Sequence, residues 1–147
     1  MSDRQPISDE VEALFRNVHP EFVAEGRLGS RAFLATKSSD FELSVCRSSL
    51  TAPADAYALH IGPKQLKSVG VWAITVGECK AQALTVLGDP VATPVPDAAH
   101  AVVDFTQISD KERKKLSQIL RRHAEDRGRV YPSESSEWPP DSAPNSA

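Results

Sequence analysis

Hydrophobic residues near the start of the chain recur at helical spacing. Ser8 is followed by acidic residues, an order typical of a helix N-cap, and Pro20 would end such a helix. The apolar positions that carry the period are Val11, Leu14, Phe15 and Val18. This pattern predicts a capped amphipathic helix, although residues 14–18 also alternate well enough to form a strand.

Short strand-like runs occupy the middle of the chain. The runs rich in β-branched, aromatic or alternating apolar residues are 32–34, 41–45, 69–76, 84–87 and 101–105. In the second run, Phe41, Leu43 and Val45 are predicted to share one face of a sheet, with Ser44 on the other. Residues 69–76 are the most apolar, which predicts a central strand buried on both faces.

Helical signals separate and follow these runs. The predicted helices and helical turns cover 52–61, 77–83 and 109–127. Thr51 is the predicted N-cap of the first. Ser109 and Glu112 form a capping box at the start of the last helix, and Gly128 would end it, so this element has the clearest signal in the chain.

The links between successive strands are shorter than the dozen or so residues that a parallel crossover requires. The sequence therefore predicts an α+β fold, with a small mixed or mainly antiparallel sheet and about three helices. The chain has 147 residues, 40% of them hydrophobic and 25% charged, an ordinary globular balance. Residues 1–131 are predicted to form a single α+β domain. Residues 132–147 are rich in Ser, Pro and Glu, which predicts a disordered tail.

Several protein classes are disfavoured by composition. No run approaches the about 18 apolar residues of a membrane span, and the first ten residues are too polar for a secretory signal, so a cytoplasmic protein is expected. Cys46 and Cys79 show no C-x-x-C spacing, and no histidine pair has metal-site spacing. We therefore predict no metal site. Phosphate-binding glycine motifs are missing too, and no cofactor is predicted.

The last predicted helix is basic, which raises the question of nucleic acid. Its cations include Lys114, Lys115, Arg121 and Arg122, and such a helix can neutralise phosphates. However, acidic residues flank these cations, and the net charge of the whole chain is −3. A solvated face of a packing helix is the favoured interpretation.

Polar residues in separate segments supply a candidate pocket. If the sheet brings their segments together, an arginine and serine hydroxyls beside imidazoles would suit a phosphate or a nucleotide. The candidate ligand-binding residues are Arg16, His19, Ser30, Ser44 and His100. The alternative is structural: serines that cap turns, a surface arginine, and histidines that fix the chain locally.

The order of these residues resembles a group of small uncharacterised bacterial proteins. The resemblance spans roughly residues 14–103, and the matching succession consists of Arg16, His19-Pro20, Ser30 with Phe33, Ser44-Val45, the Thr51-led helix, Asp89-Pro90 and His100-Ala101. Relatives tend to carry two adjacent serines where this chain has Gly29 and Ser30. The resemblance implies a bacterial cytoplasmic setting and no particular activity.

Three functional hypotheses remain open at this point. The leading one is an accessory or binding domain that acts with a protein partner in a bacterial multi-gene system, such as defence or toxin control, with Trp138 in the tail as a contact. The alternative is a nucleotide-handling enzyme of ADP-ribosyltransferase-like or phosphate-transferring type. In it, Arg16 would hold phosphate and Glu78 would be the candidate acid. His19, Ser30 and Ser44 would orient the ribose. The third is nucleic-acid binding through the basic helix.

Overall fold

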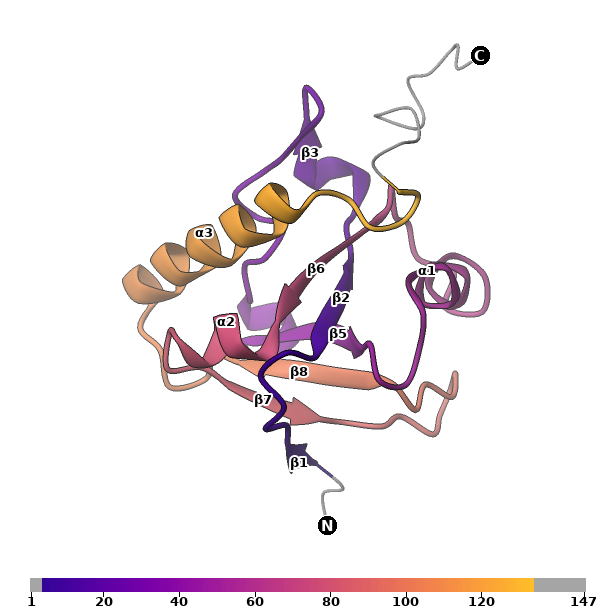
Figure 1. Cartoon of the computed structure of the whole chain (residues 1–147), viewed down its shortest axis with the longest axis horizontal. Helices are drawn as coiled ribbons and strands as arrows, with labels where there is room; N and C mark the ends of the chain where they lie inside the picture. The colour runs from indigo at the N-terminus through magenta and orange to yellow at the C-terminus, as the bar shows by residue number, and fades with distance from the viewer. Residues whose placement is uncertain (1–3, 134–147) are drawn as a thin grey trace.

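A computed structural model describes residues 4–133. Its main sheet has six strands in the order β1-β7-β8-β5-β2-β6, and all neighbouring strands are antiparallel. A second sheet pairs β3 with β4 (Figure 1). The strands are β1 Gln5–Pro6, β2 Ala13–Asn17, β3 Val23–Ala24, β4 Arg27–Leu28, β5 Glu42–Arg47, β6 Val71–Thr75, β7 Thr85–Gly88 and β8 His100–Asp104.

Three α-helices and two short 3-10 helices connect or cover these strands. They are η1 Pro20–Phe22, η2 Lys37–Ser39, α1 Pro53–Ile61, α2 Val76–Lys80 and α3 Asp110–Arg127. The predicted α+β class, with a mainly antiparallel sheet and about three helices, is confirmed. In this part of the chain, each helix is too short or too polar to cross a membrane.

The helices α3 and α1 cover opposite faces of the sheet near β2 and β6 (Figure 1). Leu116 and Leu120 of α3 belong to the main core, together with Leu14 of β2. On the other face, Phe15 packs with Tyr57 of α1 in a smaller cluster. Successive residues of one strand therefore enter different cores, as the period of two in a strand requires.

The predicted N-terminal helix is wrong, because residues 13–17 form strand β2. Leu14 and Phe15 are both buried, whereas Val11, assigned to the same helical face, is 83% exposed. The strand lies between β5 and β6, and hydrogen bonding on both sides favours it over a helix. The alternation noted for residues 14–18 was thus the correct signal.

Residues 32–34 are also not a strand. Ala32 and Phe33 are buried, which accounts for their apolar character. Their backbone forms turns instead: the amide of Ala32 donates to the carbonyl of Gly29, and that of Leu34 to the carbonyl of Arg31. Side-chain burial alone gave this segment its strand-like appearance.

The most apolar run forms β6, which is buried as predicted but lies at the edge of the sheet and not at its centre. The chain that follows α3 covers the start of this edge. The amide of Val71 donates to the carbonyl of Tyr131 at 2.7 Å, and the amide of Val130 donates to the carbonyl of Val71 at 2.8 Å. A protected edge strand can be as apolar as a central one.

The described residues include the first two positions of the predicted tail, Pro132 and Ser133. Pro132 and Ser133 are held by Arg129, whose Nε donates to the carbonyl of Pro132 at 2.7 Å, and Ser133 forms a bridge with Val130. The rest of the predicted tail lies outside the described residues.

The helix ends follow the sequence closely. Ala52, not Thr51, is the N-cap of α1, and Thr51 instead directs its hydroxyl to the Ala52 carbonyl. Ser109 caps α3 as predicted, because its Oγ accepts from the amide of Glu112. Gly128 then ends that helix.

Candidate functional site

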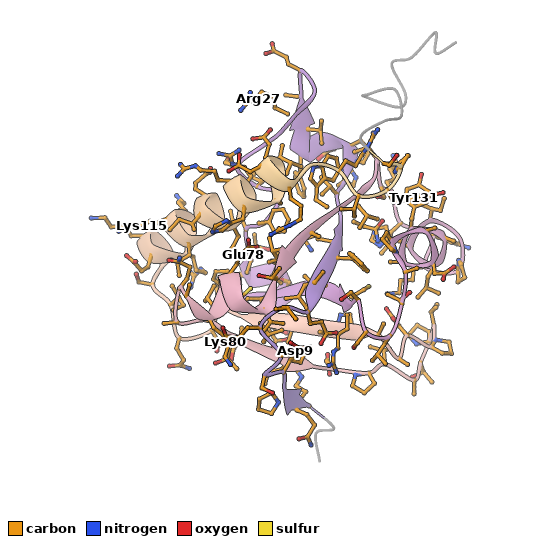
Figure 2. All side chains as sticks on the ribbon, viewed as in Figure 1. Asp9, Arg27, Glu78, Lys80, Lys115 and Tyr131 are labelled. Atoms are coloured by element: carbon orange, nitrogen blue, oxygen red, sulfur yellow. The ribbon has the colours of Figure 1, made fainter. Side chains whose placement is uncertain are left out.

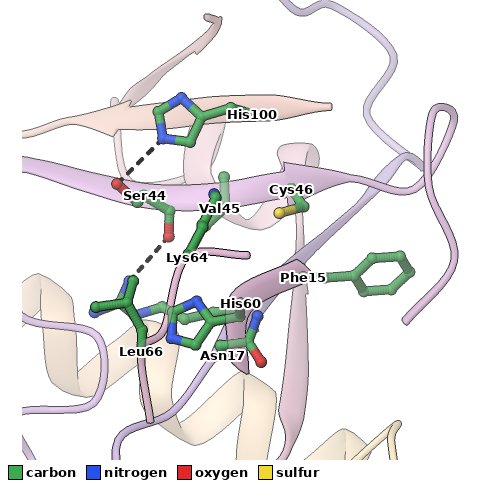
Figure 3. A pocket seen from close by; sticks show the side chains of 10 residues that line it. Phe15, Asn17, Ser44, Val45, Cys46, His60, Lys64, Leu66 and His100 are labelled. Carbon is green, nitrogen blue, oxygen red and sulfur yellow. Dashed lines mark hydrogen bonds between the residues drawn. The ribbon is translucent and has the colours of Figure 1, made fainter. Parts of the chain in front are cut away.

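Three of the five candidate residues meet at one pocket of about 130 Å³. Arg16 comes from β2, Ser44 from β5 and His100 from β8. Asn17 of β2, His60 at the end of α1 and Lys64 in the connection to β6 add further polar side chains to its lining (Figure 3). The pocket therefore joins three strands of the sheet to the segment that leaves α1.

The pocket lies where β2 and β5 part. Their ladder ends at the pair Phe15–Cys46, and beyond it Arg16 fills the gap. The Nη1 atom of Arg16 donates to the carbonyl oxygen of Ser44 at 2.9 Å, and its Nε donates to that of Ala32 at 2.6 Å. Burial lowers the pKa of Arg16 to about 10, so the guanidinium remains charged at neutral pH.

His100 is held between two residues. Its Nδ1 lies 3.0 Å from the carbonyl oxygen of Asp89 and 3.3 Å from Oδ2 of the same residue. Its Nε2 lies 3.3 Å from Oγ of Ser44, the contact that Figure 3 marks. Both neighbours of Nδ1 are acceptors, so Nδ1 carries the proton when the ring is neutral. Nε2 is then an acceptor that faces the Ser44 hydroxyl.

Lys64 adds a positive charge to the pocket, and His60 adds an imidazole beside it. Lys64 Nζ lies 2.6 Å from Oδ2 of the buried Asp97. Burial lowers the pKa of His60, and the charges of Lys64 and Arg16 act in the same direction, against a backbone hydrogen bond with Lys67 that raises it. His60 is therefore predominantly neutral at pH 7.

The thiol in the lining is an unfavourable nucleophile. Burial raises the pKa of Cys46 to about 11, and the charge of Asp97 contributes in the same direction while that of Lys64 opposes it. At neutral pH the group is a thiol, and the thiolate is the reactive form. Cys46 is thus best understood as part of the pocket wall.

His19 and Ser30 lie outside this pocket. His19 is the N-cap of η1, where its Nδ1 accepts from the amide of Glu21 at 3.0 Å, and its ring packs on Phe22. Ser30 is exposed in the turn before residues 32–34. The His19 side chain therefore has a local structural role as the cap of η1.

Glu78, the candidate acid, is engaged elsewhere. It closes the capping box of α2 by accepting from the amide of Thr75 at 2.9 Å, and it accepts from Arg127 Nη2 at 2.7 Å, between α2 and α3 (Figure 2). Burial raises its pKa, but the bonds from Arg127 and Thr75 outweigh this effect and hold the pKa below its usual value. An ionised, paired carboxylate does not supply a proton.

A second hollow of about 320 Å³ shares two residues with the first. Arg16 and Ser44 line both, so the guanidinium lies between them. Its other polar side chains include Thr36, Ser38 and Ser39. A molecule anchored in the smaller pocket could extend into this hydroxyl-rich neighbour.

Sequence reasoning missed four residues that shape the site: His60, Lys64, Asp89 and Asp97. His60 and Lys64 stand four residues apart across the end of α1, and side chains at this spacing can lie on the same side of a helix. This spacing could have indicated that the two residues lie close together. Asp89 and Asp97 precede or follow prolines in a loop, and nothing in their spacing points to β8 or to Lys64.

The basic helix presents fewer unengaged cations than its sequence suggests. Arg113 is buried over the ring of Phe41 at 3.9 Å, and Arg121 binds Gln118 and Glu125, each at 2.8 Å. Lys114, Lys115 and Arg122 are exposed, and Figure 2 shows Lys115 pointing away from the molecule. This arrangement agrees with the solvated face of a packing helix.

Comparison with known proteins identifies no relative: no family model, curated protein or solved structure matches this chain. Within residues 4–133, no group of three His, Cys, Asp or Glu side chains is placed to hold a metal ion. The chemistry of the site must therefore be argued from its own geometry.

Proposed function

We propose that this protein is a binding domain whose pocket between β2, β5, β8 and the segment after α1 holds a small anionic group, such as phosphate or a carboxylate. One observation carries the proposal. Among the described residues, those that line the pocket include two cations, Arg16 and Lys64, and two histidines, but no carboxylate. A concave site with cations and low solvent access concentrates anions.

Hydrogen-bond donors support the same ligand class. The Ser44 hydroxyl is exposed beside Arg16, whose guanidinium already donates to the carbonyls of Ala32 and Ser44. The N–H groups that these two bonds leave over can donate to a carboxylate or phosphate oxygen. Asp97 lies behind Lys64 and fixes its ammonium in place. A group that is already oriented loses less conformational entropy when a ligand binds.

Pocket size limits the ligand. A volume of about 130 Å³ is below the roughly 300 Å³ at which pockets accept a drug-sized molecule. The pocket therefore suits one anionic group and not a whole nucleotide. The adjoining hollow could accommodate the rest of a nucleotide, so a nucleotide-handling protein remains compatible with this proposal. In that case the hydroxyls of Thr36, Ser38 and Ser39, and not His19 and Ser30, would lie near the sugar.

Titration with inorganic phosphate tests the proposal, with chloride at equal ionic strength as the control. We expect amide chemical-shift changes centred on Ser44, His60 and Lys64. Lys64→Gln should weaken phosphate binding by about tenfold, the effect of about 1.4 kcal/mol in binding free energy. Shifts that chloride reproduces, or an absence of shifts at millimolar phosphate, would overturn it.

Lys67→Gln is the matched control, because Lys67 is an exposed lysine of the same segment outside the pocket lining. It should bind phosphate as the wild type does. Lys64→Gln leaves the buried carboxylate of Asp97 without its ion pair, so Ser44→Ala provides an independent variant at an exposed position. Equal weakening by Lys64→Gln and Lys67→Gln would contradict a localised site.

An accessory role with a protein partner, in the bacterial cytoplasmic setting expected from the sequence, is the second candidate. Its support is the exposure of Ile61 and Leu66, at 42% and 50%, beside or on the pocket lining. Trp138, the tail residue expected to contribute, lies outside the described residues. Pull-down from the native host, with full-length chain and a chain ending at Ser133, tests this role.

The truncation should not be made after Val130. Tyr131 pairs with the edge of β6, and Arg129 donates to the carbonyl of Pro132. A chain without Tyr131 and Pro132 could therefore fail to bind a partner only because its fold is destabilised. Failure to recover any partner with either chain would count against the accessory role. Recovery by the full chain alone would assign the contact to the tail.

A further inference from the structure

Ser44, His100 and Asp89 form a chain of hydrogen bonds that resembles an activated serine. Ser44 Oγ lies 3.3 Å from Nε2 of His100, and Nδ1 of His100 lies 3.0 Å from the carbonyl oxygen of Asp89 and 3.3 Å from its Oδ2. A nucleophile within hydrogen-bond reach of a base, which a third group orients in turn, is the arrangement that activates serine in acyl transfer.

We infer that Ser44 is a nucleophile that accepts acyl groups from small carboxylic esters, with His100 as its general base. The inference deepens the proposed binding function and rests on it, since it assigns a reaction to the same pocket. Exposure fits the two roles. Ser44 is exposed on β5 and open to a substrate, while the His100 side chain is only 16% exposed and is shielded from bulk water.

Asp89 sets the tautomer and orientation of the His100 ring and acts here as a positioning residue. Because its carbonyl and carboxylate oxygens can only accept, they hold the proton on Nδ1 and leave the lone pair of Nε2 directed at Ser44. The carboxylate is also bound by Arg4 at 3.1 Å, which fixes Asp89 in turn. Hydrogen bonds between catalytic groups are often as long as 3.3 Å in the absence of substrate, and they shorten when the substrate is bound.

The reaction balances without a further reactant except water. Ser44 Oγ forms a bond to the ester carbonyl carbon while its proton passes to Nε2 of His100. The bond from that carbon to the alcohol oxygen breaks, and this oxygen takes the proton from Nε2. Water then attacks the acyl-serine, releases the carboxylic acid and restores the Ser44 hydroxyl.

Negative charge develops on the carbonyl oxygen in both steps. Arg16 lines the same pocket, held there by its bond to the carbonyl oxygen of Ser44. A fixed cation in a sheltered pocket stabilises such an oxyanion more strongly than it would in bulk water. The same charge that favours an anionic ligand would therefore favour the transition state.

Competing nucleophiles in the pocket are at a disadvantage. The thiol of Cys46 is predominantly protonated at neutral pH, and Lys64 is paired with Asp97 at 2.6 Å. Acylation at neutral pH is therefore expected on Ser44 first.

The test uses full-length protein and p-nitrophenyl acetate at neutral pH, with release of p-nitrophenolate and the protein mass followed together. We expect acetylation mapped to Ser44. Ser44→Ala should abolish it, and His100→Asn should slow it by about 100-fold, the scale of general-base catalysis. Ser30→Ala, which removes an exposed serine outside the pocket, should react as the wild type does.

Acetyl groups on Cys46 or Lys64 in place of Ser44, or equal rates for the wild type and His100→Asn, would overturn the inference. Thermal unfolding of each variant separates loss of reaction from loss of fold. The ester is neutral and does not need the anion site, so the two proposals fail separately. Phosphate binding without acetylation would leave only the binding function, and acetylation without phosphate binding would retain the activated serine but not the anion site.

Discussion

Arg16 donates to the carbonyl oxygen of Ser44 at 2.9 Å, across the gap that opens where β2 and β5 cease to pair. The same side chain donates to the carbonyl of Ala32, so one guanidinium joins two strands to the turn at residues 32–34. Arg16, proposed from sequence as a ligand contact, therefore also holds together the backbone segments that form the pocket. Its two roles can be separated by stability and binding measurements.

Arg16→Met should destabilise the fold by about 1–3 kcal/mol, because the carbonyl of the buried Ala32 and that of the exposed Ser44 both lose their donor. Urea unfolding measures this change. Arg31→Met is the matched control, since Arg31 is exposed and stacks on Phe22, and it should cost no more than about 1 kcal/mol. Equal costs for the two variants would show that the bonds of Arg16 add nothing to stability.

Glu12 should make the fold sensitive to acid. Burial raises its pKa, but hydrogen bonds from Arg47 and Ser49 outweigh burial and hold the pKa below its usual value of 4.5. A carboxylate with a lowered pKa in the fold contributes stability above its unfolded pKa, and this contribution is lost as pH falls through the folded value. Stability should therefore decrease below about pH 4.5.

Glu12→Gln should be less stable than the wild type at pH 7, and the difference should shrink on acidification. Glu78 has a lowered pKa for similar reasons, so the variant will keep part of the acid dependence. Glu21→Gln, at an exposed site, provides the control and should follow the wild-type curve. Thermal unfolding between pH 3 and pH 7 measures these curves, and a constant gap between Glu12→Gln and the wild type would contradict the assignment.

Both cysteines should react slowly in the folded protein. Burial raises the pKa of Cys46 to about 11 and that of Cys79 to about 12, so little thiolate exists at pH 7. Cys46 is half-buried and should react with a thiol reagent before Cys79, which is fully buried. Unfolding in guanidinium should make both react at similar rates, and faster labelling of Cys79 in the native state would contradict the packing.

Leu120 should be among the most sensitive apolar positions of α3. Its side chain is fully buried in the main core, and Leu120→Ala should cost about 2–5 kcal/mol. Val11→Ala is the control, because Val11 is 83% exposed, and it should change stability by no more than about 0.5 kcal/mol. Urea midpoints compare the two, and a small effect at Leu120 would place α3 outside the cooperative core.

Several elements could be predicted from sequence because their signals are local. The helix α3 begins at a serine cap and ends at a glycine, both of which act on the backbone within one turn. The alternation of Leu43, Ser44 and Val45 likewise gave the correct faces of β5. Strand β2 was misassigned because Val11, Leu14 and Val18 satisfy a helical period by coincidence, and only hydrogen bonding to β5 and β6 resolves the ambiguity.

The sequence by itself determined the α+β class, the mainly antiparallel sheet and the ends of its clearest helix, since short links and caps constrain neighbouring residues directly. Only the tertiary structure decided that Arg16, Ser44 and His100 share a pocket, that His19 instead caps η1, and that Asp89 stands behind His100. These relations depend on strand order and register, which bring together residues far apart in the chain, such as Ser44 and His100 at a separation of 56 positions. Spacing along a chain carries no information about such distances until the sheet has formed.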